Sequence, residues 1–237
     1  LVSAPTANLA FLVIAGYALT GRSQAIQALA MSWLFNMLNS ALAPEASLAS
    51  VARYLVILAA AGSVAWRGGG IDKSTLSKSL SLTTWLLGVL LLVHSLLFSV
   101  VVDVSVLKVI SWVLVVVTLI SAWQGLSIHA RATLFEQLQL GLALLILLSL
   151  PLLALPDIGY AVNGTGFQGL LGHPQSFGPT VALAGSFFGA RALGRRLPRW
   201  GDIAVFGLCL LLAVLSEART AGLAMIFGLA VAVVLSP

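Results

Sequence analysis

The sequence predicts an all-α protein, a polytopic bundle of transmembrane helices with about nine spans. Two observations carry this prediction. The chain of 237 residues is 60% hydrophobic and 8% charged, with a mean hydropathy of +1.09, whereas a soluble domain carries about 25% charged residues. The apolar residues are also grouped into runs close to the length of about 20 residues that a bilayer core requires. So little charge could not cover the surface of a soluble domain.

The apolar runs define the expected helices in order along the chain. The second run contains polar residues, including Asn36 and Asn39, and could instead lie in the membrane interface. We divide the chain into N-terminal transmembrane helices at 1–155 and a second region at 156–237. The candidate spans cover approximately 5–20, 25–43, 49–66, 80–102, 104–122, 134–155, 174–190, 202–216 and 220–236.

The basic residues predict the orientation of these spans. With alternating sides, nine of the 12 Lys and Arg residues fall in loops on one side, which the positive-inside rule makes cytoplasmic. The opposite side then holds a long glycine-rich segment at 156–173 and a short polar island at 216–220. Both flank the seventh and eighth spans and could face one outward cavity. The nine cytoplasmic residues are Arg22, Arg67, Lys73, Lys78, Arg131, Arg191, Arg195, Arg196 and Arg199.

Composition excludes several classes of function. The net charge of +5 and the pI of about 10.0 reflect basic cytoplasmic loops, and no polar surface interleaves aromatic and basic residues, so we exclude nucleic-acid binding. Cys209 is the single cysteine and lies in an apolar run, which predicts a small packed side chain. The sequence shows no metal-site spacing, and we expect neither a metal nor a cofactor.

The island at 216–220 supplies the first candidate site. Arg219 breaks the charge rule because it lies on the outward side. Its guanidinium could simply snorkel to the membrane interface. It could also bind an anion, because a guanidinium contacts phosphate oxygens bidentately and a helix start adds free N–H groups. Glu217 could neutralise Arg219, orient its guanidinium or act as a base, and we favour the orienting role.

A second candidate set lies where the segment 156–173 meets the seventh span. His173 could transfer a proton or contact phosphate, but a helix-start residue bonded to the loop is the simpler interpretation. Gln175 offers a donor and an acceptor to an anionic or sugar ligand, and could equally cap the helix. Arg53, near the outer end of the third span, could join an outward basic cluster.

Two stretches resemble a known family. "GFQGLLGHPQSFGPTVALAG" is similar to the Gly-x-x-x-His-Pro-Asn-x-x-Gly segment of bacterial O-antigen ligases and polymerases, and "SEARTAG" resembles their Ser-x-Ser-Arg-Thr-Ala. The two stretches also occur in the same order, one helix pair apart. Gln175 departs from the family pattern, which has Asn there.

The resemblance implies a metal-free glycosyltransferase of the bacterial inner membrane. Such enzymes transfer a glycan from undecaprenyl pyrophosphate, on the periplasmic face, to lipid A-core or to another glycan, within lipopolysaccharide biosynthesis. Membrane lipids are further partners. Arg219 occupies the position of the arginine that binds the pyrophosphate, and 156–237 would begin the ligase-like core. His173 is not assigned as the family's acceptor-activating histidine.

The ends of the chain add one expectation, and two alternatives stay open. The chain begins at Leu1 without Met and ends at Pro237 after a hydrophobic run, so we interpret it as a fragment that lacks the family's large periplasmic loop and is inactive alone. A transporter would show repeat symmetry and polar residues at the bilayer midplane. A non-catalytic structural membrane subunit would tolerate substitution of the outward polar residues.

Overall fold

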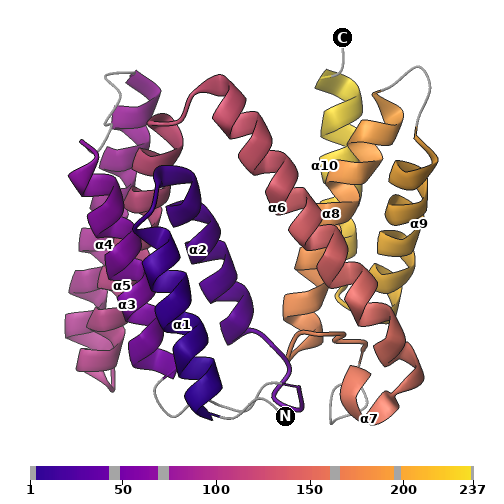
Figure 1. Cartoon of the computed structure of the whole chain (residues 1–237), viewed down its shortest axis with the longest axis horizontal. Helices are drawn as coiled ribbons and strands as arrows, with labels where there is room; N and C mark the ends of the chain where they lie inside the picture. Colours follow the sequence, from indigo (N-terminus) through magenta and orange to yellow (C-terminus); the bar gives the residue numbers. More distant parts are fainter. Residues whose placement is uncertain (1–3, 43–48, 69–74, 161–165, 195–198, 236–237) are drawn as a thin grey trace. The chain divides into compact units, whose positions relative to one another are not determined.

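The computed structural model describes the chain except for residues 1–3, 43–48, 69–74, 161–165, 195–198 and 236–237. The described residues form helices and two isolated β-bridges but no strand, which confirms the all-α prediction. Figure 1 shows the elements in chain order. They are α1 (Ala4–Ala18), α2 (Arg22–Asn36), α3 (Ala49–Trp66), α4 (Thr75–Phe98), α5 (Val102–Gln124), α6 (Ile128–Ser149), the 3₁₀ helix η1 (Leu150–Ala154), α7 (Pro156–Gly159), α8 (Pro174–Leu193), α9 (Trp200–Leu215) and α10 (Arg219–Leu235).

Among the described residues, three helices are long and apolar enough to cross a membrane: Lys78–Phe98, Val102–Gln124 and Ile128–Ala154. They correspond to the fourth, fifth and sixth predicted spans. The count of nine spans is therefore not supported. Four predicted spans fall on apolar helices of only 10–17 described residues, namely Asn8–Ala18, Val51–Trp66, Trp200–Leu215 and Arg219–Val234. The remaining two, α2 and α8, are absent from both groups, because polar residues and, in α8, Pro179 interrupt their apolar character.

The chain forms two compact units. The N-terminal unit contains Val2–Asn36 and Glu45–Phe135, and the C-terminal unit contains Met37–Pro44 and Glu136–Pro237. Helix α6 begins in the former and continues in the latter. The predicted division after residue 155 separates the N-terminal helices from a ligase-like core on functional grounds, and it stays a prediction.

The N-terminal unit is a helical bundle in which α1, α2 and α3 pack against one another, α5 packs on α2 and α3, and α4 packs on α5. Small side chains bring the first three helices together, since Ala18, Ala25 and Ala60 are fully buried. Tyr17 also donates a hydrogen bond to Gln27 across the turn between α1 and α2. The apolar side chains of α4 are mostly exposed, as suits a helix that faces a hydrocarbon environment.

Three arginines of the N-terminal unit bind carbonyl groups at the C-terminal ends of helices. Arg22 donates to the carbonyl of Gly125, after α5, and to those of Arg67 and Gly68, after α3. Arg67 donates to the carbonyl of Leu19, after α1, and Arg131 donates to those of Trp123 and Gln124. The last carbonyls of a helix lack partners within the helix and carry its negative dipole end, which a guanidinium satisfies.

These arginines belong to the set predicted to be cytoplasmic. Their contacts show that helix capping also accounts for their presence at helix ends, whatever side of a membrane they occupy. Arg191 and Asp202, from the same predicted side, form an ion pair of 3.4 Å between the end of α8 and the start of α9. Lys73, Arg195 and Arg196 lie outside the described residues.

The C-terminal unit is built around the segment 166–173. Phe167 and Leu171 are completely buried, and the ring of Phe167 packs edge-on against that of Phe177 with 5.3 Å between centroids. Backbone N–H groups of Asn39 and Gly172 donate to the carbonyls of Leu170 and Met37, which ties the segment to residues 37–42. Residues 166–171 of the predicted outer segment are thus folded into the core of their unit, because their apolar side chains are buried and their backbone groups find partners.

Helix α8 lies between α9 and α10, and Figure 1 shows these three helices side by side. A Cβ atom added at Gly185 would meet Met225 of α10 and Cys209 of α9, and one added at Gly189 would meet Leu229 and Phe206. The Gly185–Gly189 pair therefore lets two helices approach α8 closely. From Gly185 to Gly189 the contacted residue number rises along α10 and falls along α9. Helix α10 is therefore parallel to α8, and α9 is antiparallel to it.

Candidate functional site

The turn between α9 and α10 places the central candidate residues. Helix α9 ends at Leu215 and α10 begins at Arg219. The buried hydroxyl of Ser216 donates to the Ala213 carbonyl at 2.8 Å and accepts from the N–H of Ala218 at 3.4 Å. Glu217 has a φ of 55°, a left-handed conformation that costs a residue with a side chain about 1–2 kcal/mol. This conformation reverses the chain and lets α10 start with only three residues between it and α9.

A groove of about 420 Å³ opens between α9 and α10. These helices contact each other much less than either contacts α8, so their outer faces diverge. Glu217 and Arg219 line the groove at the turn, whereas Leu210 and Ile226 line it further along the helices. The groove therefore joins a charged end to an apolar remainder. The full lining is Leu210, Ala213, Val214, Glu217, Ala218, Arg219, Gly222, Met225 and Ile226.

The side chains of Glu217 and Arg219 are both exposed. Within the described part of the chain, no ion pair joins them, and the Arg219 guanidinium has no hydrogen-bond partner. The backbone N–H of Arg219 donates to the Glu217 carbonyl at 3.0 Å. A guanidinium in this state keeps its donors available for an anionic ligand. The orienting role of Glu217 stays a prediction.

His173 caps α8. It has an extended backbone, and its Nδ1 accepts a hydrogen bond of 3.1 Å from the N–H of Gln175. Pro174 follows at the first helical position, where its missing N–H costs nothing. The structure thus places His173 as a helix-start residue, which was the simpler of the two interpretations. Gln175 does not supply the cap, and its side chain is exposed.

The start of α8 packs against the turn that carries Arg219. A Cβ atom at Gly178 would lie within 3.0 Å of the Ala218 side chain, and one at Gly166 within 3.0 Å of the Ser216 carbonyl. The N–H of Phe167 also donates to the Leu215 carbonyl at 2.7 Å. The structure therefore brings Gly166, Phe167 and Gly178 against the turn at 215–218. That the segment 156–173 and the island 216–220 face one outward cavity stays a prediction. His173, Gln175, Glu217 and Arg219 all belong to this end of the C-terminal unit.

Arg53 belongs to α3, in the N-terminal unit. Its guanidinium lies over the ring of Tyr54, 5.1 Å from the centroid, and donates to the Tyr54 hydroxyl at 3.3 Å. This contact gives the Arg53 side chain a local partner. Its membership of an outward basic cluster stays a prediction.

Sequence reasoning missed the residues that hold the turn in place. Three residues outside the candidate binding set fix the backbone near Arg219, namely Gly166, Gly178 and Ser216. Gly178 lies seven residues before Gly185, a spacing that places both glycines on the same face of α8. This spacing was the signal in the sequence for a close contact at Gly178. A second groove, of about 320 Å³ between α8 and α10, was also not predicted, and it includes the hydroxyl residues Ser186 and Thr220.

Neither a metal cluster nor a known relative defines this site. Across the described residues, no group of three or more His, Cys, Asp or Glu side chains could hold a metal ion. No protein-family model, curated protein or solved structure matches the chain.

Proposed function

We propose that this chain is part of a membrane glycosyltransferase resembling O-antigen ligases, which transfers a glycan from undecaprenyl pyrophosphate to lipid A-core or to another glycan. The observation that carries the proposal is the groove between α9 and α10, with apolar walls and, at one end, a guanidinium that has no partner among the described residues. An amphiphile with an anionic head and a hydrocarbon tail matches these two ends chemically. The "HPQ" and "SEARTAG" stretches add the resemblance.

The topology proposed with this function goes beyond the three long apolar helices. The four shorter apolar helices also cross the bilayer in this proposal, and α2 and α8 complete the bundle of nine. The protein then lies in the bacterial inner membrane, with the turn at 216–220 facing the periplasm. The basic residues at the opposite ends of the helices support this orientation through the positive-inside rule.

In the proposed reaction, Arg219 binds the pyrophosphate bidentately and stabilises the negative charge that develops on it. The bond between the sugar carbon and the pyrophosphate oxygen breaks, and the acceptor hydroxyl oxygen forms the new bond from the opposite face. A general base takes the hydroxyl proton. We do not assign His173 as this base, because its Nδ1 accepts the Gln175 N–H and caps α8.

The test compares glycan transfer by the full-length gene product with that of Arg219→Ala and Arg219→Lys at matched expression. Removal of one preorganised donor to a developing anion lowers a rate by about 10²–10³-fold, and a loss of this size is expected in both variants. Arg199→Ala is the matched control, because Arg199 is also exposed and also stands at a helix start. It should keep full transfer.

Full activity of Arg219→Ala would overturn the pyrophosphate role and return the residue to a snorkelling arginine. If the wild-type product transfers glycan to neither lipid A-core nor a second glycan, the glycosyltransferase proposal fails. The transporter and the non-catalytic subunit would then be the remaining classes. Solute uptake into proteoliposomes separates these two.

A further inference from the structure

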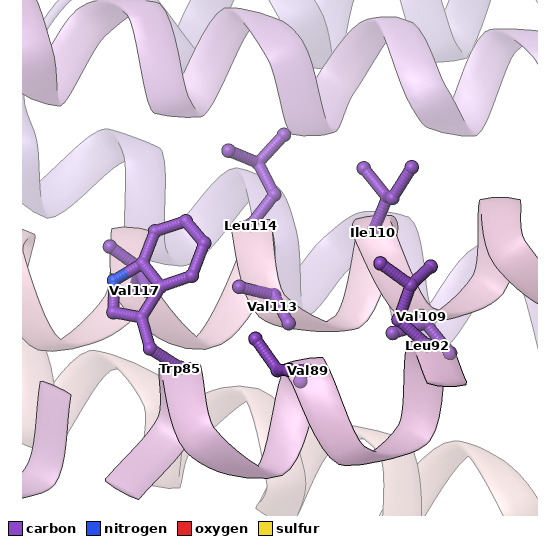
Figure 2. Close-up of a pocket in the computed structure, with 9 residues that line it drawn as sticks. Trp85, Val89, Leu92, Val109, Ile110, Val113, Leu114 and Val117 are labelled. Carbon is purple, nitrogen blue, oxygen red and sulfur yellow. The ribbon is translucent and has the colours of Figure 1, made fainter. Parts of the chain in front are cut away.

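A further apolar cavity lies in the N-terminal unit, in the helical hairpin of α4 and α5. It has a volume of about 210 Å³. Figure 2 shows Trp85 rising from α4 beside Val117, whereas Ile110 and Leu114 point away from α4. We call this cavity the hairpin groove. Its lining is Trp85, Gly88, Val89, Leu92, Val109, Ile110, Val113, Leu114 and Val117.

Gly88 sets the packing at the floor of the groove. A Cβ atom there would lie within 3.0 Å of Cγ2 of Val113, so α4 and α5 meet closely at this level only because position 88 has no side chain. Larger residues on either side of Gly88 leave space along the seam. Trp85 and Leu92, placed three and four residues away on the same face of α4, border that space.

The chemistry of the wall restricts the occupant. The lining side chains are hydrocarbon apart from the indole N–H of Trp85, so a polar ligand buried there would lose hydrogen bonds to water without replacing them.

The surroundings identify the source of hydrocarbon. Both walls belong to helices long and apolar enough to cross a membrane, and several of the apolar side chains that line the groove are exposed. Trp85 is 56% exposed, Val89 56% and Ile110 54%. In a bilayer, the molecules in contact with such side chains are the tails of the lipids.

We propose that the hairpin groove is a binding site for one acyl chain of a bilayer phospholipid. The chain lies along the seam between α4 and α5, above Gly88 and against Trp85. This site is independent of the proposed glycan transfer, since it involves neither Arg219 nor the C-terminal unit.

The test is photolabelling of the full chain in phosphatidylcholine vesicles that contain phosphatidylcholine with a diazirine on one acyl chain. Labelled peptides are mapped by mass spectrometry. We expect groove residues Val89 and Ile110 to be labelled several-fold more than Leu86 and Leu90, which are 62% and 64% exposed on α4 and do not line the groove. Labelling in proportion to exposure would overturn the proposal, because it would show only the ordinary lipid annulus.

A matched pair of variants tests the same site by filling it. Val109→Phe adds an aromatic ring inside the groove, whereas Val104→Phe adds the same ring to an exposed position of α5 outside it. Val109→Phe should abolish the excess labelling of Val89, and Val104→Phe should leave it unchanged. Equal labelling of all three proteins contradicts the proposal. A melting temperature within a few degrees of wild type shows that each variant is folded.

The second readout uses the fluorescence of Trp85 in a protein whose other tryptophans are replaced by Phe. Vesicles with brominated acyl chains should quench Trp85 at a lower fraction of brominated lipid than they quench a single Trp placed at Leu90. Cross-linking of the groove to a second copy of the chain, in place of lipid, would also overturn the proposal.

Discussion

Two arginines, one in each compact unit, begin a helix and differ in what their guanidinium groups contact. Arg22 begins α2 and Arg219 begins α10. Arg22 donates to carbonyls at the C-terminal ends of α3 and α5. The Arg219 guanidinium, within the described residues, has no such partner and lines a groove.

The difference shows that an arginine at a helix start can have two roles. In one unit its guanidinium holds helices together, and in the other its donors remain available for a ligand. A cation at the start of its own helix is opposed by the positive end of the helix dipole. For Arg22, the negative ends of two neighbouring helices compensate. Arg219 follows the C-terminal end of α9, but within the described residues its guanidinium donates to no carbonyl there. A guanidinium that keeps its donors available at this turn is consistent with an anionic ligand.

The largest effect is expected from the glycine that fixes the turn before Arg219. Gly166→Ala places a side chain at a φ of +71° and within 3.0 Å of the Ser216 carbonyl. The left-handed backbone costs about 1–2 kcal/mol and the displaced backbone about 1–3 kcal/mol more. Thermal unfolding in detergent measures the loss of stability.

Gly68→Ala is the matched control for this prediction in the N-terminal unit. Gly68 has a φ of +68° but open space around it, so only the backbone cost should appear. An equal loss in the two variants would show that the Gly166–Ser216 contact does not restrain the turn.

The next effect compares the two arginines directly. Arg22→Ala should lower the free energy of unfolding by about 1–3 kcal/mol, because three carbonyls lose a charged donor that is partly screened by solvent. Arg219→Ala should change it by less than about 0.5 kcal/mol, as for an exposed side chain without contacts. Chemical denaturation of both variants checks the prediction. A comparable loss in Arg219→Ala would mean that its guanidinium also stabilises the fold.

A smaller effect is expected from the glycine that makes room for Arg22. A Cβ atom at Gly125 would lie within 3.0 Å of the Arg22 guanidinium, so Gly125→Ala should weaken one hydrogen bond and cost about 1 kcal/mol. Gly141→Ala, in open space on α6, is the control and should stabilise by up to about 1 kcal/mol through helix propensity. The same melting experiment applies, and stabilisation by both substitutions would contradict the role given to Gly125.

The smallest effect is a gain in stability. Glu217→Gly should relieve the left-handed φ of 55° and stabilise the protein by about 0.5–1 kcal/mol. Glu136→Gly, within α6, should instead destabilise it, since glycine is unfavourable inside a helix. Chemical denaturation measures both changes. A loss of stability in Glu217→Gly would indicate that the carboxylate makes a stabilising interaction in the turn.

Some of the candidate site could be predicted from the sequence because the signal is local. The polar island around Arg219 interrupts an apolar run, and a helix does begin at Arg219. His173-Pro174 is a helix-start pattern, and α8 does start at Pro174 with His173 as its cap. Both predictions depend on neighbours within a few residues.

Other parts could not be predicted, because distant residues decide them. The count of nine spans is not supported, because polar residues interrupt the apolar character of α2 and α8 and four other helices are apolar over only 10–17 described residues. The burial of residues 166–171 was also not predicted, because partners at Asn39, Ser149 and Leu215 draw this part of the segment 156–173 into the core. Glycine content alone does not predict this burial. The outward position of the segment stays a prediction.

The sequence by itself determined the helical class and the apolar character of the chain, because the grouping of apolar residues and the scarcity of charge act over short stretches. Only the tertiary structure decided which cations are paired. Arg22 and Arg219 look alike in sequence, each at the start of a helix, and the carbonyls that bind Arg22 come from residues 45 to 103 positions away. A guanidinium becomes a structural cap or an available donor according to which helix ends the fold brings to it.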